Sequence, residues 1–176
     1  MMGIRVTSEI GAETRIVDGR LARLVGYWRG QSPEVSLPMV GDIDPLDFSY
    51  AWGYVCLVDV IHDGVRPRFQ FRLDGSRLSA ATGDWTGRFI DEIDLPEYVG
   101  MTLEGYNRNV SRRVPLHHFR DLVCDRIPVF YEAVALPLLG SGEVVGRLLI
   151  GVIPGSREDL SVDLAATNSI DLLLRH

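Results

Sequence analysis

Short segments of alternating or β-branched apolar residues recur along the chain and predict a β-sheet. In residues 68–73, for example, Phe69 and Phe71 fall on one face, because successive side chains of a strand point to opposite sides. The predicted strands are residues 54–61, 68–73, 114–125, 128–139 and 144–153. Glycine-containing turns at 62–64 and 140–143 join the first two and the last two strands as antiparallel hairpins.

Apolar residues spaced three and four positions apart predict two longer helices. The first covers residues 12–31, and its apolar stripe includes Leu21, Leu24, Val25 and Trp28. The second begins at Asp94, which is spaced to form a capping box with Glu97. It ends before Pro115, because a proline disfavours helical geometry in the residue that precedes it.

The order of these elements predicts one α+β domain, a five-stranded antiparallel sheet with helices on one face. Residues 1–31 would form an N-terminal helical extension with a frayed lead-in at 1–11. Residues 32–154 would form the domain itself, and residues 155–176 a C-terminal tail for which a helix is predicted. The stripe of the 12–31 helix needs a partner surface, which could be the same domain or a second copy of the chain.

Residues 68–88 form the most informative stretch of the chain. A break at Gly75 ends the strand, a short helical segment follows, and a second break at Gly83 leads to Trp85. A strand, a short helix and a loop that falls back across the sheet predict a half-open pouch. Such a pouch is typical of a site for a small molecule or a signal.

Composition narrows the choice of partners and of cellular location. A net charge of -6 and a pI near 5.2 argue against nucleic acid and anionic membranes as partners. No apolar run approaches the roughly 20 residues that span a bilayer, and residues 1–11 lack the apolar core of a signal peptide. We therefore expect a cytoplasmic protein without a membrane span, in which Cys56 and Cys124 are buried, reduced thiols.

The chain contains no lysine, so all 18 basic residues are arginine, a bias that a GC-rich genome would explain. The absence excludes Schiff-base aldolases, pyridoxal-phosphate enzymes and the Walker-type phosphate loop. No G-x-S-x-G elbow or G-x-G-x-x-G fingerprint is present either. Glu132 and Asp121 could form an acid–base pair, but alternating charge that faces solvent is the favoured interpretation.

Three segments in this order resemble the PAS domain superfamily: LARLVGYW, DIDP at 42–45 and FRLDGSRLSAATGDWTGR at 71–88 with its preceding strand. The details are most similar to the PAS-five subfamily of small stand-alone bacterial proteins, over residues 20–153. The resemblance implies a sensor or interaction module that holds any ligand between the sheet and the central helix. By position, the pocket walls would be Phe69, Phe71, Trp85, Tyr106, His118 and Tyr131. Each of them also has an ordinary interpretation, since an aromatic side chain that faces a sheet core is more often a packing residue.

PAS proteins often carry a kinase or a cyclase, and neither follows Ile153. The resemblance therefore implies output through a signalling protein partner or through a homodimer. The candidate dimer seam is the stripe Leu21, Leu24, Val25 and Trp28. We expect a ligand-binding sensory module without enzymatic activity; a ligand-free dimerisation or adaptor scaffold with a filled core is the alternative, and a small-molecule enzyme is a distant third.

No obligatory cofactor is expected. Haem would need an inward-facing histidine, but His117 and His118 alternate along a strand, so at most one points inward. Flavin photochemistry of the kind found in PAS-like light sensors needs a cysteine that residues 80–88 do not contain. The aspartates within residues 42–47 lack the pattern of a hard-cation loop, so we expect them to cap turns.

Overall fold

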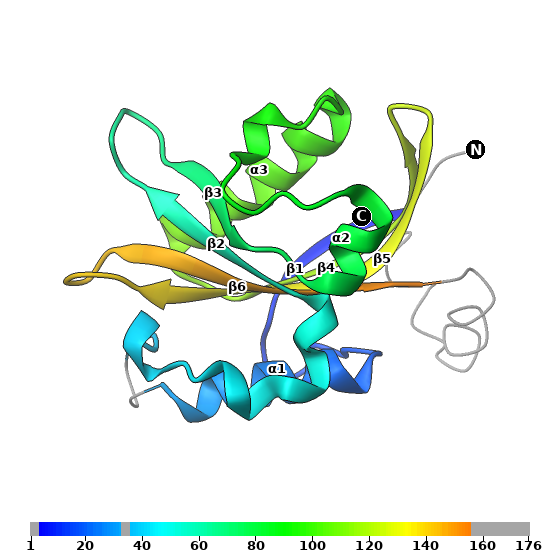
Figure 1. Cartoon of the computed structure of the whole chain (residues 1–176). Helices are drawn as coiled ribbons and strands as arrows, with labels where there is room; N and C mark the ends of the chain where they lie inside the picture. Colours follow the sequence, from blue (N-terminus) through cyan, green and yellow to red (C-terminus); the bar gives the residue numbers. More distant parts are fainter. Residues whose placement is uncertain (1–3, 33–35, 156–176) are drawn as a thin grey trace.

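The computed structural model describes residues 4–32 and 36–155, which form an α+β fold on one six-stranded antiparallel sheet (Figure 1). The strands are β1 (Ile4–Glu9), β2 (Val55–Ile61), β3 (Arg68–Leu73), β4 (Leu116–Cys124), β5 (Ile127–Leu139) and β6 (Val145–Pro154). The helices are α1 (Gly19–Gly30), α2 (Ser76–Thr82) and α3 (Pro96–Arg112), with 3-10 segments η1 (Val40–Asp42), η2 (Pro45–Tyr54) and η3 (Ile90–Glu92). The spatial order of the strands is β1-β4-β5-β6-β2-β3. The predicted helix in the C-terminal tail falls on residues 156–176, outside the described residues.

Both predicted hairpins are confirmed, but the sheet has one strand more than predicted. β2 pairs with β3 and β5 with β6, all antiparallel. The additional strand is β1, which pairs along β4 from Ile4 opposite Asp121 to Glu9 opposite Leu116. The prediction of a frayed lead-in was therefore wrong, because the partner that orders β1 lies far away in the sequence.

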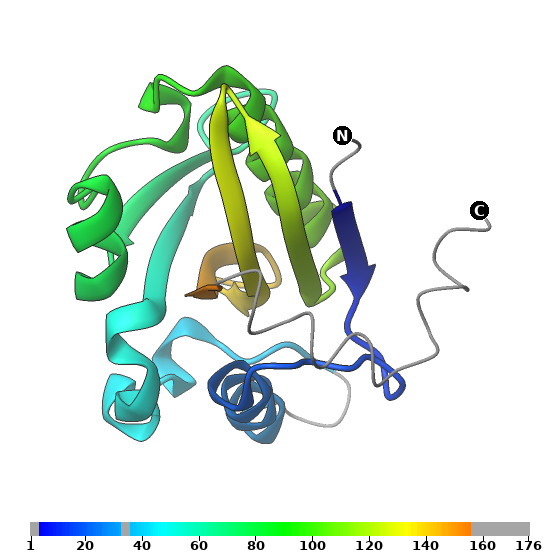
Figure 2. The same ribbon diagram turned by 90° about the vertical axis from the view of Figure 1, so that its right-hand side faces the viewer.

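Helices cover both faces of the sheet, not one as predicted. In Figure 1, α1 and η2 lie below the sheet, and α2 and α3 lie above it; Figure 2 shows the same layers from the side. Each face has its own apolar core. Both faces of β5 and β6 are buried, and successive side chains of these strands point alternately into one core and the other. Along β5, Val134 and Leu136 pack toward α1, whereas the small side chains of Ala133 and Ala135 face α3.

Helix α1 begins at Gly19, later than the apolar pattern predicts. Asp18 is its N-cap, and its carboxylate accepts the backbone N–H groups of Arg20 (2.8 Å) and Leu21 (3.4 Å). An aspartate in this position satisfies amides that have no partner within the helix, so the helix starts after it. The predicted N-terminal extension is thus part of the same core and the same sheet as the rest of the domain.

The structure contradicts the prediction that the stripe of α1 forms a dimer interface. All four stripe residues are buried against the protein's own sheet: Leu21, Leu24, Val25 and Trp28. The indole Nε1 of Trp28 donates to the carbonyl of Pro137 at 3.0 Å, and Gly151 leaves the space that Leu21 and Leu24 fill. A stripe that is already covered by the same chain offers no surface to a second copy.

Helix α3 is confirmed, but its capping box is not. The helix begins at Pro96, and no side chain at the N-cap position, Leu95, caps it. The cap comes instead from Asp125 in the β4–β5 turn, whose carboxylate accepts the backbone N–H groups of Glu97 and Tyr98. The Glu97 carboxylate in turn accepts the N–H of Asp125 at 2.8 Å. Within the described residues, no helix is long and apolar enough to cross a membrane.

Candidate functional site

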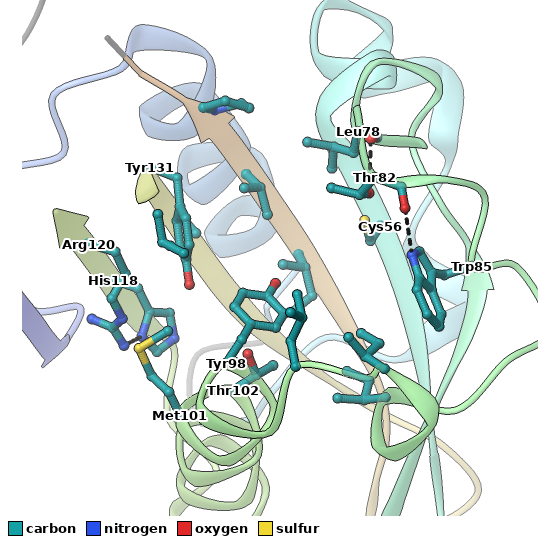
Figure 3. Close-up of a pocket in the computed structure, with 18 of the residues that line it drawn as sticks. Cys56, Leu78, Thr82, Trp85, Tyr98, Met101, Thr102, His118, Arg120 and Tyr131 are labelled. Atoms are coloured by element: carbon teal, nitrogen blue, oxygen red, sulfur yellow. Dashed lines mark hydrogen bonds between the residues drawn. The ribbon is translucent and has the colours of Figure 1, made fainter. Parts of the chain in front are cut away.

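A cavity of about 360 Å³ lies between the sheet and α3 and is bordered on its outer side by α2 and the loop that follows it (Figure 3). Its volume falls within the range of roughly 300–1,000 Å³ that is common for small-molecule sites. Most of the wall is apolar, including Leu78, Ile90, Ile93, Ile150 and Val152. Because two of the β5 side chains on this face, Ala133 and Ala135, are small, the sheet leaves room beneath α3 where larger side chains would fill it.

Five of the six residues proposed as pocket walls line this cavity: Phe71, Trp85, Tyr106, His118 and Tyr131. The sixth, Phe69, does not. Its side chain is 1% exposed and packs edge-on against Tyr106, with 5.4 Å between the ring centroids. Phe69 shares a strand face with Phe71, but it is fully buried in the packed core, whereas Phe71 is half-buried.

The outer wall of the cavity is organised by Asp74. One carboxylate oxygen accepts the thiol of Cys56 at 3.1 Å, and the other accepts the backbone N–H of Trp85 at 3.4 Å. The Trp85 indole donates to the carbonyl of Thr82 at 3.2 Å, so this loop is held against α2. Burial raises the pKa of the Cys56 thiol above its usual range, which keeps it protonated and weakly nucleophilic. Both cysteines are free and buried, as predicted.

The inner end of the cavity, beside β1, is polar. Here His118 and Arg120 come from the same face of β4, two positions apart, and lie side by side (Figure 3). The pKa of His118 is lowered to about 3, first because the ring is buried and second because Arg120 repels a further positive charge. The imidazole is therefore neutral at physiological pH.

Helix α3 passes close to the His118 ring at Gly105. A Cβ at this position would lie 2.9 Å from His118 Cε1, so only glycine lets the helix and the ring occupy their places. Phenol groups complete the polar part of the wall. Burial raises the pKa of Tyr98, Tyr106 and Tyr131, which keeps all three hydroxyls protonated and able to donate hydrogen bonds.

Sequence reasoning missed several wall residues, of which Asp74, Tyr98, Met101, Thr102 and Arg120 are the most informative. A signal for one of them was present, since strand alternation places Arg120 on the face of His118. Met101 and Thr102 had no comparable signal, because the stripe predicted for this helix ran through Val99, Leu103, Tyr106 and Val110.

The opposite face of β4 and β5 carries a second polar cluster that is not part of the cavity. Glu132 is 2% exposed, and its carboxylate accepts His117 Nε2 and the backbone N–H groups of Val17 and Asp18, each at 2.8 Å. The prediction that His117 and His118 point to opposite faces is confirmed. The interpretation of Glu132 as a solvent-facing charge was wrong, because α1 and its leading segment cover this part of the sheet.

No group of three or more histidine, cysteine, aspartate or glutamate side chains is placed to hold a metal ion in the described part of the chain. Two of the aspartates between residues 42 and 47 act as the predicted caps. Asp42 accepts the N–H of Met39, and Asp44 accepts the N–H of Leu46, each at 2.9 Å.

Comparison with protein-family models, with curated proteins and with solved structures gives no significant match. The chemistry of the site must therefore be argued from its own residues.

Proposed function

We propose that this protein is a PAS-like sensory module that binds a small, largely apolar ligand in the cavity between the sheet and α3. The observation that carries the proposal is the cavity itself, which combines an apolar wall with a few convergent polar groups. Its position between the sheet and the long helix is also the position that the resemblance to PAS domains implies for a ligand. A protein with a fully filled core would have no such space.

The proposed role is binding and signalling rather than catalysis. Two groups in the wall that could act as a nucleophile or a base have low reactivity. The Cys56 thiol is protonated, and His118 is a weak base, because its pKa is lowered to about 3 and its Nδ1 is occupied by hydrogen bonds. The segment from Asp74 to Trp85, which contains α2, closes the outer side of the cavity and lies at the surface. A ligand that contacts this segment would change the surface that a protein partner recognises.

The proposal is tested by native mass spectrometry of the purified protein, followed by identification of any small molecule that is released. Wild-type protein is expected to carry an additional mass or to take one up from a mixture of apolar and amphipathic compounds. Trp85→Ala should lower the occupancy while the circular dichroism spectrum remains that of a folded protein.

Trp52→Ala is the matched control, because Trp52 is a half-exposed tryptophan whose indole also donates to a backbone carbonyl, yet it does not line the cavity. It should leave the occupancy unchanged. Equal loss of ligand in both variants, or loss of folding together with loss of ligand in Trp85→Ala, would argue against a ligand site. An empty wild-type protein that takes up no compound would favour the ligand-free scaffold.

A further inference from the structure

The inner end of the cavity holds a buried positive charge that no carboxylate of the described residues contacts. Arg120 is 2% exposed, and the acceptors of its guanidinium within the described residues are all neutral. Nη1 donates to the carbonyls of Val6 and Phe119, and Nη2 donates to Thr7 Oγ1 at 2.7 Å and to His118 Nδ1 at 3.1 Å. Nε is buried and has no hydrogen-bond partner within residues 4–32 and 36–155.

Neighbouring arginines on the same side of the molecule differ from Arg120 in this respect. Arg5, opposite Arg120 in the β1–β4 register, forms an ion pair with Glu104, and Arg108 forms one with Glu9 at 3.2 Å. Their charges are therefore locally compensated. Buried charges are normally paired, so the guanidinium of Arg120, which no described carboxylate contacts, is a place where an anion would be stabilised.

The hydrogen bonds of Arg120 determine which group would contact that anion. His118 Nδ1 accepts from Arg120 and lies 3.1 Å from Thr7 Oγ1, so the proton of the neutral ring resides on Nε2. Among the described residues, Nε2 has no hydrogen-bond partner, and the ring lines the cavity. Because a guanidinium polarises the imidazole from behind, Nε2–H becomes a stronger donor.

The Tyr131 hydroxyl provides a second donor at the same end. It comes from the neighbouring strand, in register with Arg120, and interacts with the guanidinium. Asp74, at the outer end, would repel an anion and orient an amphipathic ligand. The cavity is therefore electrically polarised along its length, with apolar walls between its two ends.

We propose that the ligand is a small organic carboxylate with an apolar body. Its carboxylate accepts hydrogen bonds from His118 Nε2–H and Tyr131 O–H, and Arg120 compensates its charge from the layer behind. Its apolar body extends along Ile150 and Val152 toward Trp85. This inference rests on the proposed function, because it names the class of ligand that the same cavity would bind.

The test compares matched ligand pairs by isothermal titration calorimetry near neutral pH: octanoate with 1-octanol, and 3-phenylpropionate with 3-phenyl-1-propanol. Each pair has the same apolar body and differs at the head group. Wild-type protein should bind the carboxylate of at least one pair about tenfold more tightly than the alcohol, as expected for hydrogen bonds to a charged group. Tyr131→Phe and His118→Phe should reduce this preference to about threefold or less.

Two further variants separate the binding role from a structural one. His118→Gln keeps a side-chain N–H near the position of Nε2 and should retain most of the preference, whereas Arg120→Met should abolish it. Arg5→Met removes a positive charge from the adjacent strand outside the cavity and should change the preference by no more than about twofold. If Arg120→Met does not fold, the wild-type preference and Tyr131→Phe decide the question.

Equal or tighter binding of both alcohols by the wild-type protein would overturn the carboxylate inference and leave the proposed ligand-binding function intact. Failure of all four compounds to bind would also overturn the inference. The proposed function would then be decided separately by the mass-spectrometric experiment with Trp85→Ala and Trp52→Ala.

Discussion

Replacement of Glu132 by glutamine tests whether this buried carboxylate holds the start of α1 against the sheet. The carboxylate accepts three hydrogen bonds of 2.8 Å, from Val17 N, Asp18 N and His117 Nε2, and thereby attaches the start of α1 to β5. Glutamine has the same shape but offers one acceptor oxygen, so at least one buried N–H loses its partner. A hydrogen bond to a charged group contributes about 1.5–3 kcal/mol, and a buried unsatisfied donor costs about 1–3 kcal/mol. We therefore expect Glu132→Gln to lower the free energy of unfolding by about 2–4 kcal/mol.

The measurement is urea denaturation followed by circular dichroism. The expected loss is a large share of the roughly 5–15 kcal/mol that stabilises a typical domain. Glu104→Gln is the matched control, because the Glu104 side chain is 72% exposed and its ion pair with Arg5 is on the surface. Surface pairs contribute about 0–1 kcal/mol. If the two variants lose the same small amount, the buried carboxylate does not hold α1 and the reasoning is wrong.

The same substitution has a defined pH dependence. Burial by itself would raise the pKa of Glu132, but the hydrogen bonds from His117, Val17 and Asp18 outweigh it, so the pKa lies below its ordinary value. A depressed carboxyl pKa stabilises the folded state at pH values above the unfolded pKa of about 4.3 and ceases to do so as the pH falls through the folded value. The difference in stability between wild type and Glu132→Gln should thus be constant near neutral pH and shrink in acid. A difference that grows in acid would contradict this assignment.

Two further predictions concern the helices. Leu24→Asp places a charge on a fully buried face of α1, so it should lower the free energy of unfolding by about 4 kcal/mol or more and unfold the protein. Circular dichroism and size-exclusion chromatography measure the effect. A variant that stays folded and only changes its oligomeric state would restore the dimer interface as a hypothesis. Asp125→Ala removes the cap of α3 and should cost about 1 kcal/mol in thermal or urea unfolding. Asp94→Ala, at the position where the sequence pattern suggested the cap, should cost clearly less, and the reverse order would show that the cap has been misassigned.

The local pattern of the sequence determined the elements whose partners are close in the chain. The hairpins β2–β3 and β5–β6 followed from apolar strands joined by glycine turns, and α3 followed from its stripe and from Pro115 beyond its end. Strand alternation placed Phe69 and Phe71 on one face, and the resemblance to PAS domains suggested six wall residues, of which five line the cavity. Phe69 shows the limit of that argument, because alternation gives the face but not the depth along the strand.

The tertiary structure alone decided the features that depend on pairing between distant segments. β1 is a strand because β4 lies beside it, and α3 begins where it does because Asp125 of a later turn reaches its first amides. The sequence pattern assigned Glu132 to solvent and did not show that Arg120 is buried, yet each of them is 2% exposed. Their burial depends on which segment covers each face, α1 on one side and α3 on the other. A polar residue on a strand has no local signal of its cover, because burial is a property of the assembled layers and not of the strand itself.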